Sequence, residues 1–120
     1  MWFRNDLGPM GRRYAGAAFV LCLAAVVYLS VAPGDLSPTS GLPLDKVQHA
    51  FAYFVLTGLG LVAFGLRWPL LLGIAALGAG LEVVQALMGL GRQGDMVDLI
   101  ANLSGETLAA LAWLAWRRRA

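Results

Sequence analysis

Four long apolar segments constrain this chain more than any other feature. Each has the length of a membrane-spanning helix, and they cover approximately residues 14–32, 46–66, 69–90 and 98–116. The chain is 59% hydrophobic and 13% charged, whereas soluble domains are about 45–50% apolar and about 25% charged. Its 120 residues leave room for one domain. We therefore predict that residues 1–120 form a single all-α membrane domain, a bundle of four transmembrane helices.

The basic residues are distributed unequally between the two sides that four spans would create. The side that holds both termini contains Arg4, Arg12, Arg13, Arg67, Arg117, Arg118 and Arg119, and the other side contains Lys46 and Arg92. Positive residues concentrate on the cytoplasmic side of membrane proteins, so we predict that both termini are cytoplasmic. The first span is expected to be retained, because it is longer than the apolar region of a signal peptide. Arginines that flank apolar segments form no nucleic-acid surface, so no nucleic-acid partner is expected.

Polar residues interrupt the last three apolar segments at helical spacing. They recur three or four positions apart, which places those of each helix on one face: Asp45, His49 and Tyr53 in the second segment, Glu82 and Gln85 in the third, and Asp98, Asn102 and Glu106 in the fourth. Charged and amide groups that face lipid are costly, so these faces should point toward one another. We predict a polar cleft that opens to the exterior, is walled by the last three helices, and has the uncharged first helix packed outside it.

The rise of a helix, about 1.5 Å per residue, gives each polar group an expected depth below the outer surface. Three tiers are expected, at the mouth, roughly 6–9 Å down and roughly 12–14 Å down. In that order they contain Asp45, Lys46, Arg92, Asp95 and Asp98; His49, Gln85 and Asn102; and Tyr53, Glu82 and Glu106. All of these except Glu106 are candidate ligand-binding residues.

Three roles for the cleft are left open. Its residues can hydrogen-bond across helices and fix their packing, bind a ligand, or catalyse a reaction with Glu82 or His49 as the acid–base group. In the catalytic case the two basic residues at the mouth would orient a phosphate, and Asp95 or Asp98 would hold a metal. One histidine without a nearby cysteine fits no zinc spacing, so we predict no metal and no cofactor. A monomer can build the cleft, and a site shared across a dimer is left open.

Two segments of the chain resemble the VanZ-like family of small bacterial integral membrane proteins: DKVQHAFAYFVL (45–56) and GLEVVQALMGLGRQGDMVDLIANLSG (80–105). The resemblance extends over about residues 14–116. The pattern is Asp-Lys followed by His and Tyr, then Glu-x-x-Gln, an Arg-x-x-Asp-x-x-Asp turn, and an Asn before a Gly. Here it falls on Asp45, Lys46, His49, Tyr53, Glu82, Gln85, Arg92, Asp95, Asp98, Asn102 and Gly105.

The resemblance implies a multi-pass protein of the bacterial cytoplasmic membrane that acts on the cell envelope. It also implies a link to resistance to glycopeptide antibiotics of the teicoplanin type. We therefore predict that the partners are membrane lipids, and that the cleft binds an envelope lipid or another amphiphilic ligand. The alternative is a membrane-embedded enzyme that acts on a lipid-phosphate headgroup by acid–base or metal-assisted chemistry.

Overall fold

Within residues 8–31, 44–88 and 96–119, which the computed structural model describes, all regular structure is helical. The helices are α1 (Pro9–Val31), α2 (Leu44–Phe64), α3 (Trp68–Met88) and α4 (Met96–Arg119). Each of these helices is long and apolar enough to cross a membrane. At about 1.5 Å per residue, a 21-residue helix such as α2 extends over about 32 Å, close to the thickness of a bilayer's hydrocarbon core. The predicted all-α, multi-pass membrane architecture is therefore confirmed.

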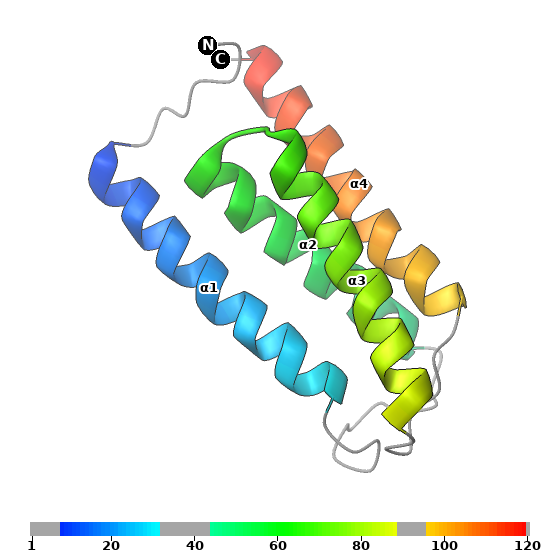
Figure 1. The fold of residues 1–120 in the computed structure, drawn as a ribbon. Coiled ribbons are helices and arrows are strands. Elements are labelled where there is room, and N and C mark those ends of the chain that lie inside the picture. Colours follow the sequence, from blue (N-terminus) through cyan, green and yellow to red (C-terminus); the bar gives the residue numbers. More distant parts are fainter. Residues whose placement is uncertain (1–7, 32–43, 89–95, 120) are drawn as a thin grey trace.

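Successive helices run in opposite directions, so that α2 and α4 are parallel neighbours (Figure 1). We call the end of the bundle where α1 and α3 finish and α2 and α4 begin the polar end. The opposite end, where α1 begins and α4 finishes, is the arginine end (Figure 1). The arginines on the described parts of the chain that flank this end are Arg12, Arg13, Arg67, Arg117 and Arg118.

The turn between α2 and α3 is built from local backbone preferences. Gly65 has a φ of 82°, and its N–H donates to the carbonyl oxygen of Leu61 at 2.8 Å. This left-handed conformation ends α2 at little cost, because glycine has no Cβ. The Nε of Arg67 donates to the carbonyl oxygen of Phe64 at 2.9 Å and satisfies an acceptor of the last helical turn. Pro69 then lies in the first turn of α3, where its missing N–H is harmless.

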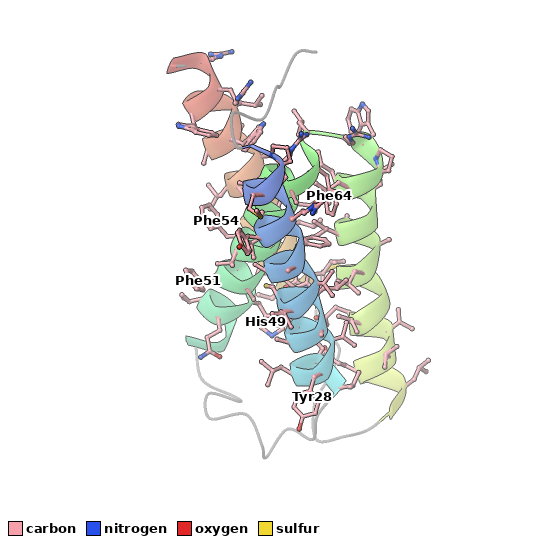
Figure 2. The ribbon with its side chains drawn as sticks, turned by 90° about the vertical axis from the view of Figure 1, so that its left-hand side faces the viewer. Tyr28, His49, Phe51, Phe54 and Phe64 are labelled. Carbon is pink, nitrogen blue, oxygen red and sulfur yellow. The ribbon has the colours of Figure 1, made fainter. Side chains whose placement is uncertain are left out.

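Polar and apolar side chains are distributed in the reverse of the pattern of a soluble domain. The described side chains that are both buried and polar are Thr57, Glu82, Gln85, Asp98, Asn102 and Glu106. Large apolar side chains such as Leu21, Phe51 and Leu87 are exposed instead. Figure 2 shows Phe51 and Phe54 pointing away from the bundle, whereas His49 lies among the helices. Lipid is the solvent that suits such an outer surface.

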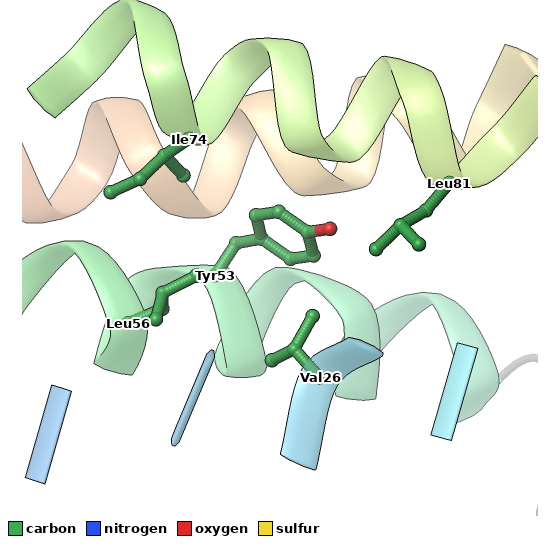
Figure 3. Close-up of a cluster of buried hydrophobic side chains, with 5 residues drawn as sticks. All are labelled: Val26, Tyr53, Leu56, Ile74 and Leu81. Carbon is green, nitrogen blue, oxygen red and sulfur yellow. The ribbon is translucent and has the colours of Figure 1, made fainter. Parts of the chain in front are cut away.

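The apolar core joins α1, α2 and α3. Val26 of α1, Tyr53 and Leu56 of α2, and Ile74 and Leu81 of α3 form one buried cluster (Figure 3). α2 packs most extensively against α4 and next against α1. Between the described parts of α1 and α4 there is no contact. α1 thus packs against α2 and α3 and supplies part of the core.

α2 and α4 come into backbone contact at Gly105. A Cβ at this position would collide with the carbonyl oxygen of Ala50, and it would lie 2.9 Å from the Ala50 carbonyl carbon and 3.0 Å from the Phe54 nitrogen. Small residues allow membrane helices to approach one another in this way. This contact fixes the spacing of α2 and α4 beside the polar residues described next.

Candidate functional site

Three of the predicted site residues converge at the polar end, each from a different helix. Ligand atoms of His49 (α2), Glu82 (α3) and Asp98 (α4) all lie within 4.8 Å of one another. We call these residues the three-helix cluster. Only 9% of Glu82 and 6% of Asp98 is exposed, and His49 is half-buried. An imidazole and two carboxylates are thus held together inside a bundle whose outer surface is apolar.

Asn102 orients the imidazole of the cluster. Its Oδ1 lies 3.2 Å from Nδ1 of His49. An amide oxygen only accepts hydrogen bonds, so Nδ1 is the donor and carries the proton. Nε2 is then the ring nitrogen with the lone pair. Asn102 lies four residues after Asp98 on the same face of α4 and is also buried.

Polar groups continue below the cluster toward the middle of the bundle. The buried Tyr53 has its hydroxyl between α2 and α3 (Figure 3). Gly78 leaves space for this arrangement, because a Cβ there would lie 3.3 Å from Nδ2 of Asn102 and 3.4 Å from Cε2 of Tyr53. Tyr53 and Asn102 therefore both pack against α3 at Gly78.

Glu106 was not among the candidate ligand-binding residues. It is only 7% exposed, and its Oε2 is buried with no hydrogen-bond partner among the described residues. The sequence signal for it is its position four residues after Asn102, on the polar face of α4. The family pattern does not include this position, but the structure buries its side chain.

Gln85 does not belong to the three-helix cluster. Its Nε2 donates to the carbonyl oxygen of Ser30 at 2.9 Å. Ser30 lies in the last turn of α1, where carbonyl groups have no partner within the helix. Gln85 therefore connects α3 to the end of α1. The predicted polar face of α3 gave no indication of this contact.

The predicted separation of Asp98, His49 and Glu82 into three different depths is wrong. Asp98 was expected at the mouth and Glu82 in the deepest tier, yet they share one cluster with His49. The reason is that the expected depths assume straight helices along the membrane normal, whereas side-chain length and helix tilt also determine where a charged group lies.

The remaining predicted residues lie outside the part of the chain that the structure describes in atomic detail. Arg92 and Asp95 fall between α3 and α4. Asp45 and Lys46 lie in the first turn of α2, and their side chains are not described.

Comparison with known proteins identifies a relative in fission yeast. The chain matches no protein-family model and no solved structure. It is similar to the uncharacterized protein C11E3.10 of Schizosaccharomyces pombe, with 32% identity over 115 residues. The match covers 90% of this chain and 67% of the yeast protein. The chain therefore belongs to the same protein family as C11E3.10.

Proposed function

We propose that this chain is a VanZ-like protein of the bacterial cytoplasmic membrane that binds the polar headgroup of an envelope lipid between α2, α3 and α4. The observation that carries the proposal is the three-helix cluster, His49, Glu82 and Asp98 within 4.8 Å of one another. Ionisable residues inside membrane helices are expensive and typically serve a function. Asn102 links α4 to α2 through His49, and two buried carboxylates beside this imidazole form a polar group that a lipid headgroup can contact.

The orientation that we propose has both termini in the cytoplasm. The described arginines that flank the arginine end support it, because positive charge concentrates on the cytoplasmic side. The three-helix cluster then lies in the outer leaflet. Alkaline phosphatase fused after residue 94 should be active, and green fluorescent protein fused to the C-terminus should fluoresce. Inactive phosphatase at residue 94 would contradict this orientation.

The relative in fission yeast favours one class of ligand over another. Fungi have no peptidoglycan, so a ligand of the shared fold need not be a cell-wall precursor. A lipid headgroup that occurs in both bacterial and fungal membranes is compatible with the proposed bacterial location and with the yeast relative. A link to teicoplanin-type resistance rests on the VanZ-like resemblance alone, and we treat it as a consequence of lipid binding. If that is right, overproduction should change the minimal inhibitory concentration of teicoplanin.

Native mass spectrometry of the protein, purified in mild detergent with its membrane lipids retained, tests headgroup binding. The wild-type protein should carry a lipid with one type of headgroup, and Glu82→Gln and His49→Ala should each lose it. Ser104→Ala is the matched control, because Ser104 is exposed and its hydroxyl donates only to its own helix, at the carbonyl oxygen of Ile100. Equal lipid retention in all four proteins would refute the proposal.

A second function is favoured by the position of His49 beside two carboxylates. An imidazole paired with a carboxylate is a common general acid–base arrangement. In this alternative the chain is a membrane-embedded enzyme that acts on a lipid-phosphate headgroup. The two functions differ in the expected behaviour of Glu82→Gln. If Glu82 only binds the headgroup, this variant loses the lipid; if Glu82 is catalytic, the variant retains the lipid and accumulates it uncleaved.

A further inference from the structure

We infer that the three-helix cluster is a binding site for a single divalent metal ion, with His49, Glu82 and Asp98 as its ligands. The sequence shows no metal-binding motif, because the three residues come from three helices and lie far apart in the chain. In the structure, one imidazole nitrogen and two carboxylate oxygens lie within 4.8 Å of one another. Three protein ligands with one position left for water or substrate is the usual composition of a reactive zinc site.

The spacing of these atoms suits a metal after a small adjustment. Ligand atoms around one tetrahedral Zn²⁺ at about 2.0–2.2 Å lie about 3.4 Å apart. The longest separation, at most 4.8 Å, must therefore shorten by up to about 1.4 Å, which rotation of the Glu82 and Asp98 carboxylates can supply. With a neutral His49, the two carboxylates balance the charge of a divalent ion.

The hydrogen bond to Asn102 supports the same assignment. It places the proton of His49 on Nδ1, and Nε2 is then the nitrogen that can bind a metal. Histidine ligands of metals commonly donate their second ring N–H to an oxygen acceptor, which fixes the ring orientation. In this role Asn102 is a positioning residue.

An independent observation comes from Glu106. Its carboxylate is buried deeper in the same polar group, and its Oε2 has no hydrogen-bond partner among the described residues. The polar face of α4 thus continues inward from Asp98 with a further buried acidic group. The described arginines flank the opposite end of the bundle.

The identity of the metal follows from the ligands. Imidazole favours zinc and other transition metals, whereas all-oxygen sites favour Mg²⁺ and Ca²⁺. We expect Zn²⁺ to bind more tightly than Mn²⁺, and Mn²⁺ more tightly than Mg²⁺. One further step rests on the proposed function: the open coordination position would take a phosphate oxygen, so that the bound headgroup carries a phosphate rather than only an amine.

The metal is tested with the full-length protein in nanodiscs, purified through a tag without histidine and stripped with EDTA. Isothermal titration with ZnCl₂, MnCl₂ and MgCl₂ should give one site with the stated order of affinity. Asp98→Asn should weaken Zn²⁺ binding by at least about tenfold, and Asn102→Ala by about 10–100-fold. Ser104→Ala should bind as the wild type does.

A spectroscopic measurement on the wild type protects the test against variants that do not fold. The chain has a single histidine, so electron spin echo modulation of bound Mn²⁺ should show coupling to one imidazole nitrogen. If no nitrogen coupling is seen, or if Mg²⁺ and Zn²⁺ bind with equal affinity, His49 is not a ligand of the metal. If no metal binds at millimolar concentration, the inference is overturned. The Glu82 and Asp98 carboxylates would then be neutralised by basic side chains of the protein.

Metal binding and lipid binding can fail separately. If Zn²⁺ binds but native mass spectrometry finds no retained lipid, the metal site stands and the proposed function fails. If a lipid is retained and no Zn²⁺ binds in the titration, the proposed function stands and the metal inference fails. If phosphatidylglycerol is retained only with Zn²⁺ present, both are supported.

Discussion

The contact between Gly105 and α2 gives the sharpest stability prediction. Gly105→Ala adds one methyl group that collides with the Ala50 carbonyl oxygen and lies 2.9 Å from its carbon and 3.0 Å from the Phe54 nitrogen. Ordinary van der Waals contacts begin near 3.4 Å. The neighbouring atoms belong to backbone and cannot rotate away, so α2 and α4 must separate locally. Overpacking typically costs about 1–3 kcal/mol, and we expect the upper end of that range.

Reversible SDS titration in mixed micelles, followed by circular dichroism, measures this loss in the free energy of unfolding. Gly58→Ala is the control, because Gly58 is a half-buried glycine of α2 and a Cβ there would meet nothing within 4 Å. The control should remain within about 0.5 kcal/mol of the wild type. If Gly105→Ala and Gly58→Ala are equally stable, α2 and α4 are farther apart than the structure indicates, and the reasoning fails.

Three further substitutions test other contacts. Gly60→Ala should lower the free energy of unfolding by about 1 kcal/mol, less than the change at Gly105. The atom nearest to the added Cβ, at 2.9 Å, is the end of the Leu70 side chain, which can move. Equal losses for Gly60→Ala and Gly105→Ala in SDS titration would contradict this reasoning. Gln85→Met should lower the free energy of unfolding by about 0.5–1.5 kcal/mol, because the hydrogen bond to α1 is lost, but it should leave lipid retention unchanged in native mass spectrometry. Asn102→Ala removes the hydrogen bond to His49 and should cost about 0.6–1.7 kcal/mol in the same titration, and a larger loss would mean that Asn102 also supports packing.

The sequence alone determined the membrane architecture, because the requirement to span a bilayer is local. Each apolar segment must satisfy its own backbone hydrogen bonds and cover about 30 Å, so its length and composition are sufficient to identify it. Spacing of three and four residues likewise assigned the polar residues to one face of α2, α3 and α4. These arguments needed no knowledge of how the helices pack.

Only the tertiary structure decided which polar residues meet. The stagger, tilt and rotation of each helix depend on side-chain packing between segments distant in sequence, such as Gly105 against Ala50. Residue counting therefore separated Glu82 from Asp98, whereas the packed bundle unites them with His49. The pattern of a single helix shows which face is polar, but the position of its neighbours determines what that face contacts.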